Sequence, residues 1–324
     1  MKTFNILLAA LFLLVTGSGF AQRGEHKDFN GPSKTYSKSY PAGAGDRLSI
    51  MNEYGDVTVN TWDKNEFKVD VTVKVSAANG DDQKLLNLIS INDNKNGPAV
   101  NFYTKISNYH TTGREKMLIN YTVWMPSKNQ LSVMDHYGRI NIPDMDATVI
   151  IKSFYGSVTT KNINGNLADF LISYSNASIG TIKTGKMIIE YGKADIASAD
   201  VLTGVLEYSG LNVGRLDNNG SFHASYGAGV DINNLGKDFK KLDITSEYAN
   251  TAIGARNTGD ANFDITIENG AFKQQGNNVT ILSTTPPTNS RGWSPTKNYK
   301  GRIGKGDDGK MITINSSYGS VKVY

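Results

Sequence analysis

Two pairs of titratable residues are the best candidates for chemistry in this sequence. Glu190 and Glu207 each precede a tyrosine, in the segments IIEYGKADIA and LEYSGLNVG. If these segments stack as neighbouring strands, the two carboxylates lie about 5 Å apart, close to the separation found in retaining glycosidases. We favour the alternative, a solvated acidic stripe, because neither acid has an obvious desolvating neighbour. Asp135 and His136 form the second pair, which lacks a third catalytic group.

Two further motifs resemble ligand sites but fit turns better. GKGDDG (304–309) matches the dinucleotide pattern, yet the strand-like KMITIN follows it where a helix N-terminus is needed. Asn92, Asn94 and Asn96 before Gly97 resemble a calcium loop with too little charge. The four histidines form no spaced ligand cluster, and the chain has no cysteine and no nucleophile elbow. We therefore predict no catalytic, cofactor-binding or metal-binding residue and no enzymatic activity.

One loop could contact a ligand. The segment 284–310 is rich in proline and glycine near its start, and it interrupts two strand-like segments. Long excursions on a rigid scaffold are often functional or disordered. Its candidate contacts with a glycan or protein partner are Arg291, Trp293, Tyr299 and Lys300.

The first 21 residues have the pattern of a secretory signal peptide. Lys2 is followed by a short apolar run, and Gly19 and Ala21 form a cleavage site before Gln22. The run is too short for a membrane span. Without this segment the chain has 33 basic and 30 acidic residues in no basic cluster, so nucleic acid is not an expected partner. We expect a protein of the periplasm or cell surface of a Gram-negative bacterium, with no membrane span after cleavage.

A tyrosine recurs about every twenty residues through most of the chain. A fixed period of this size indicates a repeat architecture. The repeated residues are Tyr54, Tyr137, Tyr155, Tyr174, Tyr191, Tyr208, Tyr226, Tyr248 and Tyr318, with Asn269 in the equivalent place.

The residues around each tyrosine alternate between apolar and polar, which indicates two strands per repeat. One repeat cannot bury its own apolar face, so we predict stacking into an all-β, right-handed parallel β-solenoid, a β-helix-like fold. Parity places each tyrosine ring inside a corner, stacked on its equivalents, with the small polar residue two positions earlier as partner for the hydroxyl. The glycine, serine or alanine after the tyrosine would permit the turn. Tyr226 breaks step by one residue, which predicts a bulge.

The rest of the chain divides into three parts. Residues 22–45 read as a linker that adds one edge strand near 36–40, and residues 46–130 as an N-terminal β region of antiparallel strands with one short helical turn near 78–88. Residues 131–324 form the solenoid, with the loop excursion at 284–310. An antiparallel meander with recurring hairpins is the alternative architecture for this last part.

Residues 48–77, LSIMNEYGDVTVNTWDKNEFKVDVTVKVSA, resemble the bacterial exported “putative adhesin” family. The segments NLADFLISYSNASIG and TGKMIIEYGKADIA resemble the repeating body of the same family, so the resemblance covers about residues 46 to 324. It implies a β-solenoid body and a surface-binding role, and it transfers no catalytic residue.

These observations favour a non-enzymatic, exported cell-envelope protein that acts as an adhesin-like structural or binding β-solenoid. Its expected partner is a cell-surface glycan or an envelope protein. Two alternatives stay open, a polysaccharide-active enzyme on a β-helix scaffold and a periplasmic signalling or interaction partner.

Overall fold

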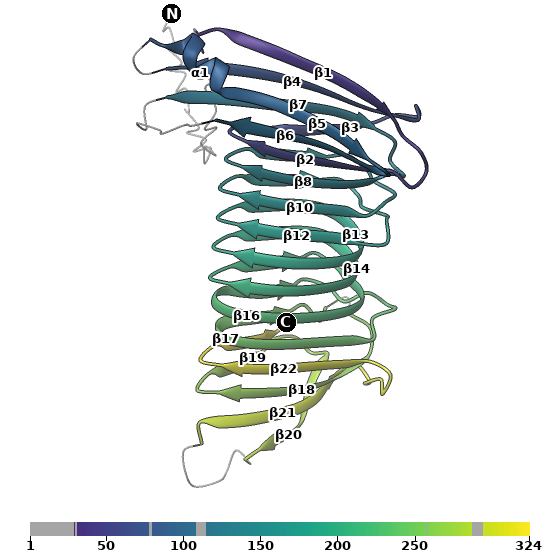
Figure 1. The fold of residues 1–324 in the computed structure, drawn as a ribbon. Coiled ribbons are helices and arrows are strands. Elements are labelled where there is room, and N and C mark those ends of the chain that lie inside the picture. The colour runs from purple at the N-terminus through teal and green to yellow at the C-terminus, as the bar shows by residue number, and fades with distance from the viewer. Residues whose placement is uncertain (1–28, 30, 78–79, 108–114, 257, 287–293) are drawn as a thin grey trace, which may run out of the picture.

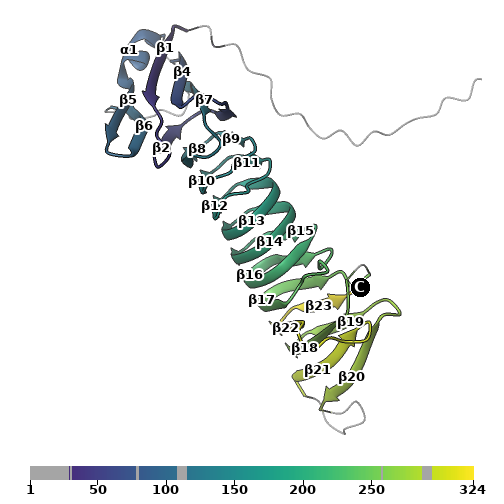
Figure 2. The same ribbon diagram turned by 90° about the vertical axis from the view of Figure 1, so that its right-hand side faces the viewer.

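The protein is all-β and rod-shaped, as Figures 1 and 2 show. The computed structural model describes residues 29, 31–77, 80–107, 115–256, 258–286 and 294–324. In these ranges all strands belong to one connected sheet of 23 strands, accompanied by one helix. That helix is too short to cross a bilayer. The expected signal peptide, residues 1–21, lies outside the described residues.

The N-terminal region is mainly antiparallel. Strand β4 lies between β1 and β7 and is antiparallel to both, while β5 and β6 form a hairpin. This confirms the expected antiparallel strands and the edge strand near 36–40. Its elements are β1 (Ser33–Pro41), β2 (Arg47–Glu53), β3 (Val57–Thr61), β4 (Glu66–Ser76), α1 (Asp82–Leu88), β5 (Ile89–Asn96), β6 (Ala99–Ile106) and β7 (Lys116–Met125).

The body of the rod consists of coils that lie on one another in parallel register. We call residues 130–274 and 311–324 the stacked coils. Their strands are β8 (Gln130–His136), β9 (Arg139–Ile142), β10 (Val149–Phe154), β11 (Ser157–Thr160), β12 (Ala168–Ser173), β13 (Asn176–Glu190), β14 (Lys193–Glu207), β15 (Gly210–Val213), β16 (Leu216–Ile232), β17 (Lys241–Ile253), β18 (Ala261–Glu268), β19 (Ala271–Gln274), β22 (Met311–Ser317) and β23 (Ser320–Val323).

Equivalent residues of successive coils are direct neighbours in the sheet. Val133 pairs with Ile151, Ile151 with Phe170, and Phe170 with Met187, always in parallel. This pairing confirms parallel stacking and excludes the antiparallel meander for these coils. The ladder shifts register between Gly227 and Val230, which confirms the bulge expected after Tyr226.

The core runs along the inside of the coils. The apolar residues four positions before each tyrosine are buried, and so are most of those three and five positions after it. Burial of one such aliphatic side chain stabilises the fold by roughly 1.5–3 kcal/mol. Since each coil contributes only a few of these side chains, a coil is stable only when its neighbours cover both of its open edges.

The coils at the C-terminal end do not follow chain order. Strand β22 pairs in parallel with β17 on one side and with β18 on the other, so the last coil in the sequence lies between two earlier ones (Figure 2). The expected loop at 284–310 is wrong for part of its length, because Thr296–Ile303 forms strand β21. This strand lies antiparallel between β18 and β20 (Val279–Thr285), where the open edge of β18 offers it backbone hydrogen bonds.

Candidate functional site

The most distinctive surface feature is a continuous column of stacked tyrosine rings. Consecutive ring centroids lie 4.7 to 5.3 Å apart, with planes inclined by 4° to 15°. The rise between neighbouring strands sets this spacing. The tyrosine column consists of Tyr54, Tyr137, Tyr155, Tyr174, Tyr191, Tyr208, Tyr226, Tyr248 and Tyr318.

The rings stack as expected, but the prediction that they point inward is wrong. From Tyr137 to Tyr318 the tyrosines of the column are 43% to 53% exposed. All nine have φ between +49° and +65°, the left-handed conformation. One residue in this conformation interrupts the alternation of a strand, so parity counted along the sequence assigns the ring to the wrong side.

The left-handed backbone explains which residue can occupy the corner. A non-glycine residue adopts it at a cost of about 1–2 kcal/mol, and asparagine tolerates it better than most. Asn269 has φ +51° at the equivalent corner of an outer coil. At the tyrosine corners, each ring pair offsets part of this cost by about 0.5–1.5 kcal/mol.

The small residue after the tyrosine is required by close backbone approach. A Cβ at Gly138, Gly156 or Gly192 would lie 1.8 to 2.2 Å from the carbonyl oxygen of the neighbouring coil. None of the three has positive φ, so space and not backbone conformation selects glycine here. Serine also occurs at this position, and the Ser209 hydroxyl accepts a hydrogen bond from the Gly192 N–H at 3.1 Å.

The residue two positions before the tyrosine lies inside the coil, away from the phenol. The expected hydrogen bond to a tyrosine hydroxyl is therefore wrong. The Asn52 side-chain amide instead donates to the carbonyls of Gly55 and Ile119 at 3.0 and 2.9 Å. Within the described part of the chain, neither carboxyl oxygen of the buried Asp135 has a hydrogen-bond partner. Burial raises the pKa of Asp135 to about 8, because the charged carboxylate loses its hydration.

Asp135 and His136 cannot act as a pair. They are consecutive in β8, so Asp135 lies in the interior while His136 lies half-buried on the outer surface. The His136 ring stacks on Phe154 of the next coil, with centroids 4.6 Å apart. Among the residues that the structure describes, no three histidines and acids are arranged to hold a metal ion.

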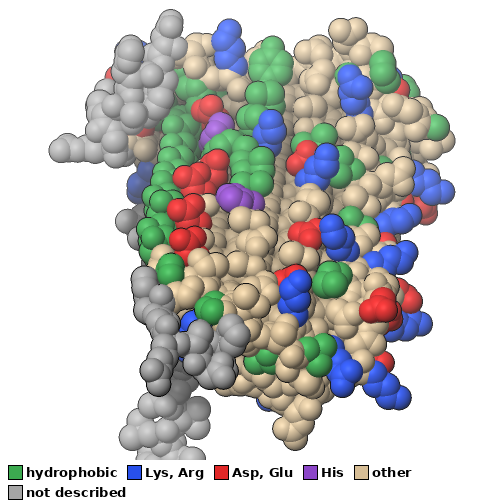
Figure 3. All heavy atoms as spheres, turned by 90° about the horizontal axis from the view of Figure 1, so that it is seen from below, with side chains coloured by type: hydrophobic (Ala, Val, Ile, Leu, Met, Phe, Trp, Pro, Cys, Tyr) green, Lys and Arg blue, Asp and Glu red, His purple; other side chains and the backbone are tan. Residues whose placement is uncertain are grey.

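Beside the tyrosine column runs an outward face with acids and apolar groups. Figure 3 shows a column of hydrophobic side chains, acids next to it and further hydrophobic side chains beyond them. Glu190 and Glu207 are direct neighbours on β13 and β14, as expected. Two residues before them, Ile188 and Val205 are 44% and 50% exposed.

A shallow hollow of ≈ 490 Å³ opens over these strands. Ile188 and Val205 line it together with Lys186, Thr203 and His223. Ring stacking covers the faces of the tyrosines, so only ring edges and hydroxyl groups of the column border this face. The surface therefore offers one phenolic hydroxyl per coil, with carboxylates and apolar side chains together beside it on β13 and β14.

Of the four residues proposed for the C-terminal loop, the structure describes Tyr299 and Lys300. Tyr299 and Lys300 are consecutive in β21, and their side chains lie on opposite faces of that strand. Tyr299 packs on Phe272 with ring centroids 4.8 Å apart, whereas Lys300 forms an ion pair with Asp264 at 3.2 Å. Arg291 and Trp293 lie outside the described residues.

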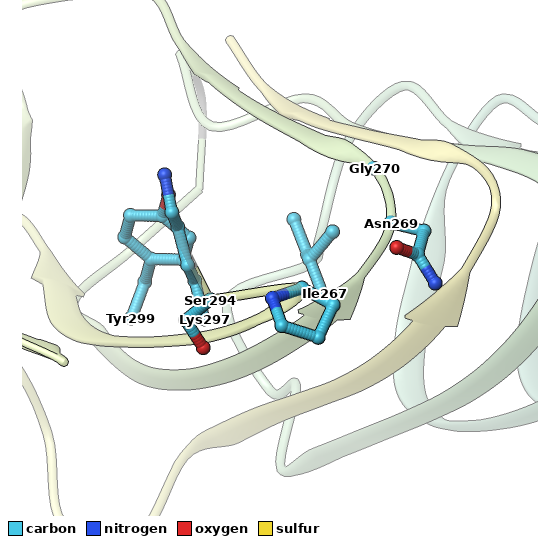
Figure 4. A pocket seen from close by; sticks show the side chains of 7 residues that line it. Ile267, Asn269, Gly270, Ser294, Lys297 and Tyr299 are labelled. Carbon is cyan, nitrogen blue, oxygen red and sulfur yellow. The ribbon is translucent and has the colours of Figure 1, made fainter. Parts of the chain in front are cut away.

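Tyr299 borders a pocket of ≈ 330 Å³ near the end of the tyrosine column. In Figure 4, Ile267 lies between Asn269 and the group formed by Ser294, Lys297 and Tyr299. Asn269 stands at this corner in place of a tyrosine, so the tyrosine column has no ring on this coil. The pocket lies next to this end of the column.

Sequence reasoning missed a polar hollow of ≈ 600 Å³ near the β5–β6 turn. Asn94, Asn96, Asn101, Gln130 and Ser132 are among its lining residues. The run of asparagines in NDNKNGPAVN was the available signal. The hairpin expected there is confirmed, and so is the turn at GKGDDG.

No family model matches this sequence, and no curated protein matches it. Among solved structures, a “putative adhesin” from Bacteroides fragilis matches at 10% identity and TM-score 0.37, covering 90% of this chain and 97% of that one. A “putative adhesin” from Parabacteroides distasonis matches at 11% identity and TM-score 0.37, covering 91% and 98%. A “putative lipid binding protein” from the same species matches at 10% identity and TM-score 0.35, covering 91% and 98%.

Proposed function

We propose that this protein is a non-enzymatic, exported cell-envelope protein that binds a repetitive cell-surface glycan along its tyrosine column. One observation carries the proposal: eight successive ring contacts align nine tyrosine rings at nearly constant spacing, and the eight from Tyr137 to Tyr318 are about half exposed. A surface that repeats one set of groups many times suits a ligand that also repeats.

Repetition compensates for weak individual contacts. Each coil offers a phenolic hydroxyl and a few neighbouring polar or apolar groups, which alone hold a sugar only weakly. A polymer that touches several coils gains affinity because every contact after the first is intramolecular. This mode of binding needs a straight, rigid scaffold, which the parallel ladder of the stacked coils supplies.

The decisive experiment compares the wild-type protein with the triple variant Tyr174→Asn, Tyr191→Asn and Tyr208→Asn on a glycan array. Asparagine is chosen because it occupies the same backbone conformation at residue 269. We expect at least a tenfold loss of binding to the retained glycan with the coils still folded. Unchanged binding would refute the role of the column.

A pull-down from envelope extracts tests the third candidate function. Co-purification of one defined protein, independent of the column variants, would favour the periplasmic signalling or interaction partner over glycan binding.

The adjacency of Glu190 and Glu207 favours a polysaccharide-active enzyme as the second candidate. Both carboxylates lie on an open face, and the hollow beside them is shallow. The enzyme would release new reducing ends from a polysaccharide, and Glu190→Gln with Glu207→Gln would abolish that release. If the protein is not an enzyme, as we propose, neither the wild type nor the double variant releases reducing ends.

We further propose the right-handed solenoid and the organisation expected from the sequence: a signal peptide at 1–21, a linker at 22–45, an N-terminal β region at 46–130 and the solenoid at 131–324. Mass spectrometry of the exported protein should give Gln22 as its first residue, and fractionation should place it in the periplasm or at the surface. Arg291, Trp293, Tyr299 and Lys300 stay a second proposed contact for a glycan or partner.

A further inference from the structure

We infer that the outward face of β13 and β14 beside the tyrosine column binds a cationic amino-sugar polymer, laid along the rod with an ammonium group between Glu190 and Glu207. The inference rests on the proposed function and names the chemical class of its ligand. It combines three properties of this face: unpaired carboxylates, exposed apolar side chains and the spacing of the coils.

The carboxylates of this face are not neutralised by the protein. Glu190 and Glu207 form no ion pair with any residue that the structure describes. Elsewhere on the stacked coils, by contrast, acids pair with a basic residue two positions away. The pairs are Lys193–Asp195, Arg215–Asp217 and Lys241–Asp243, with nitrogen–oxygen distances of 2.8 to 2.9 Å. Free negative charge is thus available for a ligand at Glu190 and Glu207.

The other charges around the hollow do not cancel this negative charge. Lys186 lies four residues before Glu190 and pairs across the ladder with Asp169 of the preceding coil. The positive charge of Lys186 and the negative charge of Asp169 therefore add up to no net charge. His223 borders the hollow on the following coil and lies next to Ser225. Nearest the tyrosine column, the face therefore carries the two glutamate charges.

The apolar side chains give the ligand a second kind of contact. Ile188 and Val205 are about half exposed and lie on adjacent strands in direct register. The C–H face of a sugar ring can pack against such side chains. Stacking on Tyr191 and Tyr208 is excluded because each ring is covered on both faces by its neighbours in the column.

The spacing selects the kind of polymer. The ring centroids of Tyr191 and Tyr208 lie 4.9 Å apart, and Glu190 and Glu207 precede these two tyrosines on the same two coils. Side chains on one face of an extended peptide repeat at roughly 6.6–6.8 Å. A linked pyranose unit advances by a length close to one coil, and successive rings of a 1,4-linked chain turn to opposite sides. The ammonium groups on one side of an amino-sugar polymer therefore recur with every second coil, so one of them can lie between Glu190 and Glu207.

The test uses glucosamine oligomers and N-acetylglucosamine oligomers of equal length, titrated into the full protein at a pH where the amines are protonated. We expect the glucosamine oligomer to bind more tightly and to lose affinity as ionic strength rises. The double variant Glu190→Gln and Glu207→Gln should weaken its binding about fivefold to tenfold, because each exposed charge pair contributes at most about 1 kcal/mol.

The matched control is Asp195→Asn with Asp217→Asn, which changes the net charge equally at ion-paired acids away from this face and should change binding less than twofold. Equal affinity of the two oligomers, or equal effects of the two double variants, would overturn the inference. If glucosamine oligomers fail to bind while another glycan binds through the tyrosine column, the proposed function stands and this inference falls.

Discussion

The stacked coils and the N-terminal region belong to one sheet but select their residues differently. In the coils, the neighbours of a residue are its own equivalents: Ile189 lies between Ile172 and Leu206. In the N-terminal region, Val71 lies between Tyr36 and Tyr121, from unrelated parts of the chain. A repeated sequence is therefore necessary only in the coils. There, a substitution at one position alters the packing of the equivalent residues on the two neighbouring coils.

The largest effect should come from filling the gap between two coils. Gly192→Val would place a Cβ 2.2 Å from the Ser175 carbonyl oxygen, and the backbone there cannot yield without breaking the ladder. We expect the free energy of unfolding to fall by about 3 kcal/mol or more. Urea unfolding measures it, with Gly45→Val of the N-terminal region as control because open space surrounds Gly45. Similar losses in both variants would contradict the comparison.

At the junction of the two regions, removal of a buried acid should stabilise the protein. The pKa of Asp135 is raised to about 8, so the folded state keeps its proton where the unfolded state has lost it. Wild-type stability must then fall as the pH rises from about 4 to about 8. Asp135→Asn does not titrate and should be more stable by about 1–3 kcal/mol at pH 8.

Thermal unfolding at several pH values measures this effect. The advantage of Asp135→Asn should shrink toward zero near pH 4, where the carboxyl is protonated in both states. A pH-independent difference would show that ionisation of Asp135 is not its cause.

The tyrosine column should show a smaller effect that depends on the replacement. Tyr191→Asn loses two ring contacts but keeps a residue suited to positive φ, so we expect a loss of about 1–2 kcal/mol. Tyr191→Ala should cost about 1 kcal/mol more. Tyr103→Asn, at an exposed strand position outside the column, is the control and should cost less than the change at Tyr191. If alanine and asparagine were equivalent at residue 191, the backbone explanation would fail.

The smallest effect concerns the exposed ion pairs of the stacked coils. Asp243→Asn removes the exposed pair with Lys241 and should lower the free energy of unfolding by about 0.5 kcal/mol or less. Chemical denaturation at low and high salt measures the difference, which should disappear at high salt. A loss above 1 kcal/mol would mean that these pairs help to hold the coils together.

The sequence predicted the stacking but not the side on which the rings lie. The near-constant spacing from Tyr137 to Tyr226 was sufficient to predict one ring per coil. Period and parity contain no information about the sign of φ, so they could not predict that the tyrosine rings point outward. Asn269, at a corner otherwise occupied by tyrosine, was the available sign of a left-handed backbone.

The order of the coils at the C-terminal end and the hollow beside Val205 could not be read from the chain. Any segment with the right parity fits against any other, so the sequence does not specify that β22 lies between β17 and β18. The hollow depends on side chains from several coils whose relative heights follow from that stacking. The glutamate pair was found because Glu190 and Glu207 hold the same place in consecutive repeats.

The position of β22 also restricts the order in which the protein can be assembled. Within the described residues, β18 is joined to the rod only through a strand that is synthesised after it. A polypeptide emerging from its N-terminus can wind coil upon coil only as far as β17. Strands β18 and β19 can join the rod only after β22 and β23 have been synthesised. A product truncated before Met311 would leave β18 and β19 without their partner strands in the rod and open to cleavage by a protease.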